Sequence, residues 1–336
     1  MPGQYVGHLP AQDPLYHYLR YDILSQMGVA GSPAEFRVFR MRAFKEVYLY
    51  EEKHTGTWLV GKFFVAAGVH DDGRGRHRMQ QEFENLQLLR GYGFAGYPHH
   101  VARPWGTNAW LNSVLIEEYC RGTLLSTVIT AAIHRGKRQW LFGKLTALAY
   151  FLSALHNRTA NDLGVDFHED CAYLDRLVHT LRRKQIIGDW DVDELYWLRD
   201  RWREQPRMWE DRQVLVHGDA TPSNFIFGHD LDVTAIDVER MKRADRVFDL
   251  GRIAGELQHF YLQATENKYG AEPFIGHFLW EYSCHFPDRE RAFRAITSRL
   301  PFQMGLTLLR IARNSWVPPT HRQRLVEEAK IILRTF

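Results

Sequence analysis

Three oxygen-bearing side chains lie close together in the sequence and could hold a metal ion and a phosphate chain. The stretch VLVHGDATPSNFIFGHDLDVTAIDVERMKRADRVFDLGR contains Asp219, then Asn224, then Asp237. Mg²⁺ prefers hard oxygen ligands and takes only one or two of them from the protein, leaving the rest to phosphate and water. These residue types therefore indicate phosphoryl transfer.

Short strands are predicted to position these three side chains. The apolar run VLV precedes Asp219, and NFIFG and DVTAID are typical of two further strands. A hairpin between those strands would bring Asn224, which begins one strand, beside Asp237, which ends the other. Asp219 would lie nearby on the preceding loop.

The surrounding elements predict an α+β, bilobal fold. Residues 1–35 are interpreted as a helical extension, 36–119 as a small sheet lobe that binds nucleotide, and 120–336 as a helical lobe with the catalytic loop and acceptor site. In the small lobe FRVFRM, EVYLYEE, TWLVGKFFV and SVLIEEY indicate strands, HTGT a hairpin turn, and QQEFENLQLLRGYG a helix. The stretch HDDGRGRHR before that helix is expected to be a mobile loop.

At these positions the sequence resembles the aminoglycoside phosphotransferase and choline kinase family, which has a protein-kinase-like fold. Its motifs are matched by His217, Gly218, Asp219 and Asn224, by Ile236 and Asp237, and by Asp245, Asp249 and Leu250. The resemblance implies that Asp219 is the catalytic base, that Asn224 and Asp237 hold Mg²⁺, and that Asp249 braces the catalytic loop. We expect His217 to pack the loop, and Glu239 corresponds to an acidic residue near the metals of choline kinases.

Lys62 resembles the family's nucleotide-binding lysine. It lies in the apolar run LVGKFF, where a lysine is unusual unless it points into a cleft. Kinases hold such a lysine with a carboxylate, and the family's helix pattern favours Glu82 as that partner. Glu84, on another face of the same helix, is the alternative.

The segment SVLIEEYCRGTLL resembles the family's linker between the lobes. Backbone groups from Glu118 to Cys120 would then bind the adenine edge of ATP, and GTP stays open as the nucleotide. In one departure from many relatives, the loop MRAFKEV has no glycine, and Lys45 would supply a charge in its place.

Of two alternatives, one is also a phosphoryl-transfer enzyme and the other belongs to a different functional class. An atypical protein kinase is disfavoured because the chain has no HRD, DFG or APE motif. A non-catalytic, kinase-like nucleotide-binding or adaptor protein would be expected to lack part of the set Lys62, Asp219, Asn224 and Asp237.

The expected acceptor is a small molecule with a hydroxyl group, such as a sugar, an amino sugar or an amino alcohol. Residues 240–336 contain 16 Lys and Arg against 10 Asp and Glu. A polycationic acceptor needs a pocket lined with carboxylates, so this balance favours an uncharged or anionic acceptor.

Composition argues against several other partners. The chain has 43 basic and 40 acidic residues, which gives no reason to expect nucleic-acid binding. The run LTALAYFLSAL is too short to insert across a membrane. Three scattered cysteines and an amino terminus without a secretory pattern predict a cytoplasmic protein. The oligomeric state stays open.

Overall fold

The computed structural model describes residues 3–29, 34–41, 46–66, 68–69 and 71–336. The chain divides into two compact units: unit 1 comprises residues 1–121 and 234–239, and unit 2 comprises residues 122–233 and 240–336. The predicted domain limits at 35/36 and 119/120 stay a prediction.

Unit 1 is built on an antiparallel sheet of six strands in the order β1-β2-β3-β4-β8-β7. The strands are β1 (Gln4–His8), β2 (Phe36–Arg40), β3 (Val47–Glu52), β4 (Trp58–Phe63), β7 (Pro104–Asn108) and β8 (Val114–Glu118). Strands β3 and β4 pair from Val47↔Lys62 to Glu51↔Trp58, so the hairpin predicted at HTGT is confirmed. Successive side chains of a strand point to opposite faces, so Leu59 and Lys62 lie on different faces of this sheet.

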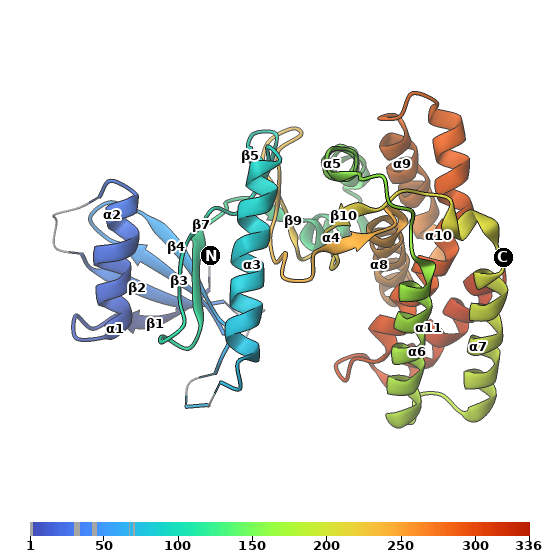
Figure 1. Cartoon of the computed structure of the whole chain (residues 1–336), viewed down its shortest axis with the longest axis horizontal. Coiled ribbons are helices and arrows are strands. Elements are labelled where there is room, and N and C mark those ends of the chain that lie inside the picture. The colour runs from blue at the N-terminus through green and yellow to red at the C-terminus, as the bar shows by residue number, and fades with distance from the viewer. Residues whose placement is uncertain (1–2, 30–33, 42–45, 67, 70) are drawn as a thin grey trace. The chain divides into compact units, whose positions relative to one another are not determined.

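Helices of unit 1 pack against both faces of the sheet. The segment α1 (Pro14–His17), a π-helical turn (Tyr18–Ile23) and α2 (Leu24–Gln26) buries Leu19 and Ile23 in a cluster with Phe36, Leu59 and Ile116. Helix α3 (Arg74–Gly91) packs against β7 and β8, and a small hairpin, β5 (Ala95–Gly96) and β6 (His99–Val101), follows it. Figure 1 shows the strands between the α1–α2 segment and α3.

Two local features of unit 1 differ from the sequence prediction. The segment Gln4–His8, which was not predicted as a strand, forms strand β1, because its backbone pairs with β2. The predicted mobile loop HDDGRGRHR is mostly the start of α3. The carboxylate of Asp71 accepts the backbone N–H groups of Gly73, Gly75 and Arg76, which satisfies donors that a helix start leaves unpaired.

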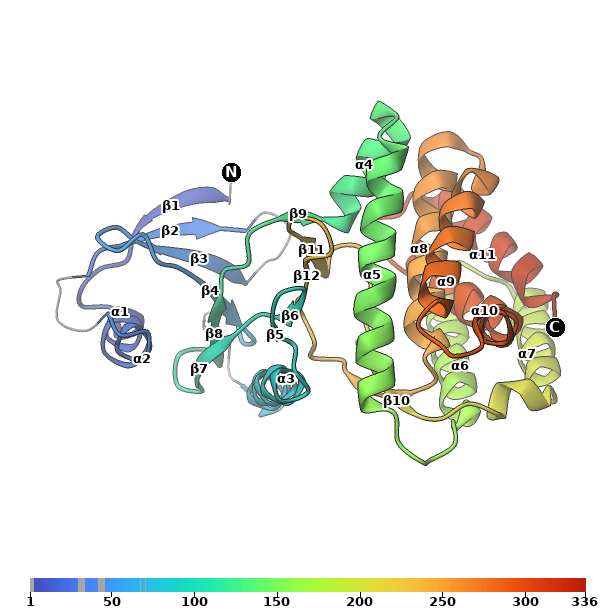
Figure 2. The ribbon, with the colours of Figure 1, turned by 90° about the horizontal axis from the view of Figure 1, so that it is seen from above.

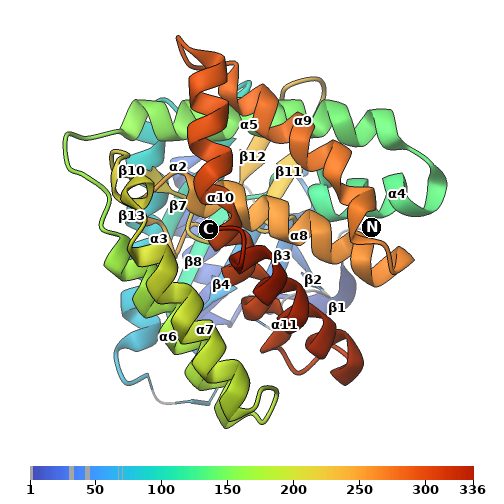
Figure 3. The same cartoon turned by 90° about the vertical axis from the view of Figure 1, so that its right-hand side faces the viewer.

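Unit 2 is mostly helical, as expected. Its helices are α4 (Leu125–Arg135), α5 (Arg138–Thr159), α6 (Phe167–Arg183), α7 (Asp189–Arg203), a 3₁₀ turn (Pro206–Trp209), α8 (Val247–Thr265), a 3₁₀ turn (Lys268–Ala271), α9 (Glu272–Ser283), α10 (Arg289–Ala312) and α11 (Pro319–Leu333). Helix α5 lies beside α4 (Figure 2), and α8 and α11 both lie beside α10 (Figure 3).

Short strands lie between these helices. They are β9 (Thr123–Leu124), β10 (Val214–Val216), β11 (Phe225–Phe227) and β13 (Lys242–Ala244), and the chain passes from unit 2 to unit 1 within β12 (Val233–Ala235). In unit 2, β10 pairs with β13 and β11 pairs with β9. The strands predicted before Asp219 and after Asn224 are therefore present.

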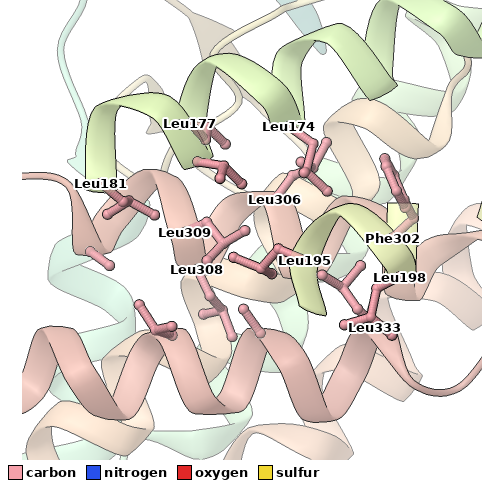
Figure 4. Packing of buried hydrophobic residues seen from close by; sticks show 14 of the residues in the cluster. Leu174, Leu177, Leu181, Leu195, Leu198, Phe302, Leu306, Leu308, Leu309 and Leu333 are labelled. Carbon is pink, nitrogen blue, oxygen red and sulfur yellow. The ribbon is translucent and has the colours of Figure 1, made fainter. Parts of the chain in front are cut away.

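The core of unit 2 joins two consecutive helices, α6 and α7, to two others much later in the sequence, α10 and α11. Leu174 and Leu177 of α6, Leu195 of α7 and Leu309 of α10 are fully buried in one cluster that also includes residues of α11 (Figure 4). Each such side chain contributes about 1.5–3 kcal/mol when buried. This packing holds α10 in place within unit 2. None of the helices in the described residues is both long enough and apolar enough to cross a bilayer.

Candidate active site

Lys62 lies among three carboxylates of unit 1, of which those of Glu82 and Glu117 are buried. Its Nζ atom is 2.5 Å from Glu82 Oε1, 3.3 Å from Glu117 Oε2 and 3.9 Å from Asp237 Oδ1. Strand pairing explains the position of Glu117, because it lies opposite Val60, which shares a face of the sheet with Lys62. Glu117 was not predicted from the sequence.

Burial and charge act in opposite directions on this group. Burial lowers the pKa of Lys62, but the carboxylates of Glu117, Glu82 and Asp237 outweigh it, so that the pKa is raised and the ammonium stays charged. Burial raises the pKa of Glu82 and of Glu117, although the Lys62 charge opposes this. In the described part of the chain, Glu82 Oε2 and Glu117 Oε1 are buried without a hydrogen-bond partner. A further positive charge nearby would therefore be stabilised.

One face of α3 organises this group. Arg78, Glu82 and Asn85 follow one another at intervals of four and three residues, which places them on the same side of a helix. Arg78 Nη2 lies 2.7 Å from Glu239 Oε2, and Asn85 Nδ2 donates to the carbonyl of Val238 at 2.8 Å. Helix α3 thus holds the segment after Asp237 with the same face that presents Glu82 to Lys62.

The two acidic residues left open in the sequence analysis have different surroundings. Glu82 contacts Lys62, whereas Glu84 lies on the exposed side of α3, where its Oε1 accepts from Gln80 Nε2 at 2.8 Å. The structure therefore gives Glu82 as the partner of Lys62.

Asp237 has an unusual backbone conformation. Its φ of +63° lies in the left-handed region, which side chains other than Asn, Asp and Gly rarely adopt. Its carboxylate is 35 % exposed, unlike those of Glu82 and Glu117. Among the three carboxylates near Lys62, that of Asp237 is thus the one that faces solvent.

The predicted linker residues lie at the end of β8. The backbone N–H of Glu118 donates to the carbonyl of Arg103 at 2.9 Å, and the Glu118 side chain accepts from the Arg103 N–H at 3.1 Å. Cys120 Sγ lies 3.9 Å from the carbonyl oxygen of Glu118. Lys45, named in the sequence analysis, lies outside the described residues.

In unit 2 the loop after β10 is held by Asp249 of α8. Asp249 accepts the backbone N–H of His217 at 2.6 Å and that of Gly218 at 3.1 Å, and His156 Nε2 lies 3.2 Å from it. Burial raises the pKa of the Asp249 carboxyl, but the contacts with His156 and His217 outweigh it, so the pKa is lowered and the group stays ionised. The brace implied by the family resemblance is therefore present.

Gly218 is required at its position in this loop. Its φ is +78°, and a Cβ atom there would lie 1.9 Å from the carbonyl oxygen of Arg240. Both the conformation and the close approach exclude a side chain. His217 is buried, packs against the ring of Phe225 and accepts the Asp219 N–H on Nδ1 at 3.3 Å, so it packs the loop as expected.

Asp219 and Asn224 share a hydrogen bond within the loop. Asn224 Nδ2 donates to the backbone carbonyl of Asp219 at 2.8 Å, so the amide nitrogen is occupied by the loop. Asn224 Oδ1 is the atom that remains to bind a cation, and Ser223 Oγ donates to it at 3.3 Å.

The side chain of Asp219 has a partner that the sequence did not predict. Arg310 Nη2 of α10 lies 2.6 Å from Asp219 Oδ1, and Arg310 Nη1 lies 3.3 Å from Glu256 Oε1 of α8. Two glycines of α8 allow the close packing behind this contact. A Cβ at Gly251 would lie 2.3 Å from the side chain of Gln303, and one at Gly255 would also be too close to α10.

The sequence profile of the phosphotransferase enzyme family (APH) matches residues 46–281. No curated protein sequence matches the chain.

Solved structures share the fold at low identity. An ethanolamine kinase from Plasmodium vivax superposes with a TM-score of 0.60 at 14% identity, covering 96% of this chain and 88% of that one. The aminoglycoside phosphotransferase APH(2")-IIa, in a complex with streptomycin and ATP, has a TM-score of 0.55 at 12% identity, covering 97% of both chains. A choline kinase from Streptococcus pneumoniae has a TM-score of 0.52 at 15% identity, covering 87% and 90%.

These findings confirm the predicted fold class and the expectation of a small-molecule kinase. They do not favour a non-catalytic module or a protein kinase. The profile matches more than half of the residues of this chain, and the chain therefore belongs to the phosphotransferase enzyme family.

Proposed function

We propose that this chain transfers the γ-phosphate of Mg·ATP to a hydroxyl group of a small acceptor. The observation that carries the proposal is the contact between Lys62 and Glu82 at 2.5 Å. Kinases need a lysine held by a helical carboxylate to position the nucleotide phosphates. Twenty residues separate the two, and unit 1 brings them together inside a buried group.

The nucleotide is assigned to unit 1. Lys62 binds the α- and β-phosphates, Glu82 holds Lys62 in place, and Glu117 adds a second carboxylate. The backbone N–H of Glu118 already serves the sheet, so the adenine edge is left to the carbonyl of Glu118 and the N–H of Cys120. ATP is the expected nucleotide. Among the structural relatives, one is an ATP complex and another, an aminoglycoside 2'-phosphotransferase, is a GDP complex, so GTP is the alternative.

The residues present fit a magnesium ion. Asp237 offers an exposed carboxylate close to a group with unpaired acidic oxygens, and Asn224 offers an amide oxygen whose nitrogen is held by the loop. Mg²⁺ usually takes only one or two hard oxygen ligands from a protein, and each of these residues offers one. Mg²⁺ would neutralise charge on the transferred phosphoryl group.

Asp219 acts on the acceptor. Its Oδ1 is held by Arg310, and Oδ2 receives the proton of the acceptor hydroxyl. The bond between the γ-phosphorus and the β–γ bridging oxygen breaks, a bond forms from the acceptor oxygen to phosphorus, and ADP leaves. Similarity to kinases of ethanolamine, choline and aminoglycosides supports a small hydroxyl compound as the acceptor.

Calorimetric titration of nucleotide tests this proposal. The wild-type chain should bind ATP more tightly with Mg²⁺ than without it, and more tightly than GTP. Asp237→Ala should lose the metal-dependent part of the affinity, whereas Glu84→Gln, a change on the exposed side of α3, should keep it. Equal affinity of Asp237→Ala and wild type for Mg·ATP would contradict the metal assignment.

A further inference from the structure

Arg252 of α8 is a buried cation that forms no ion pair with the described residues. Its residue is 4 % exposed, and within the described part of the chain Nε and Nη1 have no hydrogen-bond partner. Its guanidinium carbon lies 5.5 Å from the centre of the Phe248 ring. A buried charge that is left unpaired is costly, so the position indicates a ligand that pairs with it.

The acidic side chains beside Arg252 are already engaged. Glu256 lies one turn further along α8, but its Oε1 contacts Arg310 at 3.3 Å, and Asp219 Oδ1 contacts the same guanidinium at 2.6 Å. Arg310 therefore forms ion pairs with both carboxylates, and Arg252 forms none with the described residues.

The charges of Arg252, Glu256 and Arg310 act on one another. Burial lowers the pKa of Arg310, and the neighbouring charge of Arg252 lowers it further. Burial raises the pKa of Glu256, while Arg310 and Arg252 oppose this. Two guanidinium groups are thus close enough to repel each other, and an anion between them would relieve that repulsion.

We propose that the acceptor carries an anionic group, a phosphate or a carboxylate, that is bound by Arg252 together with Arg310. The inference rests on the proposed kinase function and specifies its substrate class. Guanidinium groups bind carboxylates and phosphates through paired N–H donors. Since Arg310 also holds Asp219, an anion bound there would place a hydroxyl of the same molecule within reach of the catalytic base. A polycationic acceptor would meet two arginines at this point.

The phosphates of the nucleotide are a different source of negative charge, and they are assigned to Lys62 and not to Arg252. Lys62 and the metal ligand Asp237 belong to unit 1. Arg252, Arg310 and Asp219 belong to unit 2. The experiment therefore measures anion binding while the nucleotide site is filled.

The test titrates inorganic phosphate, glycerol 3-phosphate, glycerate, glycerol and ethanolamine into the full chain saturated with Mg²⁺ and a non-hydrolysable ATP analogue. Saturable binding of the three anions, with little binding of glycerol and ethanolamine, is expected. Comparison of glycerol 3-phosphate with glycerate shows whether the group is a phosphate or a carboxylate. Arg252→Met should weaken anion binding about ten- to hundredfold, the size of a charge-assisted hydrogen bond.

Matched variants keep the result clear. Arg294→Met, a change at an exposed arginine on α10, should leave anion binding unchanged, and Arg252→Lys, which keeps the charge, should retain part of it if Arg252→Met does not fold. The inference is overturned if no anion binds to the chain saturated with the ATP analogue, or if Arg252→Met binds the anion as wild type does. Failure of the analogue itself to bind would instead contradict the proposed kinase function.

Discussion

Asp249 accepts the backbone N–H of His217 at 2.6 Å, two residues before Asp219. The first turn of α8 thus fixes the loop that carries the proposed base, and it does so through backbone groups. The same carboxylate also accepts from Gly218 and His156. Three donors on one buried carboxylate hold the loop in a single conformation, in which Gly218 is the residue with the least freedom to change.

Gly218→Ala should therefore disrupt the loop. The new Cβ would meet the carbonyl of Arg240 at 1.9 Å in a left-handed conformation, and we expect a loss of more than about 3 kcal/mol in the free energy of unfolding. Gly136→Ala is the matched control, because Gly136 has a φ of +65° with open space around it. That change should cost only ~1 kcal/mol. Urea unfolding of both variants measures the difference, and equal losses would show that the close approach is unimportant.

Lys62 and Glu82 should behave as one unit in nucleotide binding. Because Glu82 acts by holding Lys62, the double variant Lys62→Met/Glu82→Gln should lose little more affinity for Mg·ATP than Lys62→Met alone. Glu84→Gln combined with Lys62→Met serves as the comparison, and there the two effects should add to within about 0.5 kcal/mol. Fully additive losses for Lys62 and Glu82 would show that they bind the nucleotide independently.

Local sequence patterns predicted those parts of the site that depend on nearby residues. The β3–β4 hairpin, the strand before Asp219 and the face of α3 that carries Glu82 follow from periodicity and turn residues. The contact of Glu117 with Lys62 could not be predicted in this way. Glu117 and Glu118 are adjacent, and only the strand register tells which of the two lies on the same face as Lys62.

Contacts between distant segments could not be predicted. Arg310 lies 91 residues after Asp219, and it reaches Asp219 because the glycines of α8 allow α10 to approach. Nothing in the sequence around Arg310 distinguishes it from the other arginines of α10.

Asp170 should make the protein less stable as the pH rises. It is buried on α6, Oδ1 has no hydrogen-bond partner in the described chain, and burial raises its pKa to about 6. The folded state then binds this proton more tightly than the unfolded state, whose Asp pKa is about 3.9. The contribution of the Asp170 carboxyl to the free energy of unfolding is fully present below pH ~4. It falls by roughly 2–3 kcal/mol as the pH rises to ~6.

The variant Asp170→Asn isolates that effect. It should remove the decline, so that the variant gains stability over wild type at pH 7 and not at pH 4. Urea unfolding at both pH values measures it, with the exposed Asp193→Asn as a control that keeps the wild-type profile. A decline that persists unchanged in Asp170→Asn would place its origin in another group.

Asp219→Asn is the change that tests the catalytic mechanism. Asparagine keeps an oxygen for Arg310 Nη2, which lies 2.6 Å from Oδ1 in the wild-type chain, so the side chain should stay in place. The amide nitrogen would replace Oδ2 and could not take the proton of the acceptor hydroxyl. General-base catalysis contributes about 10²- to 10⁴-fold, and the loss should appear in kcat while affinity for Mg·ATP is kept. Single-turnover transfer to the acceptor measures the chemical step directly. Near wild-type turnover in Asp219→Asn would mean that phosphoryl transfer proceeds without this carboxylate, and the base would then have to be sought elsewhere in unit 2.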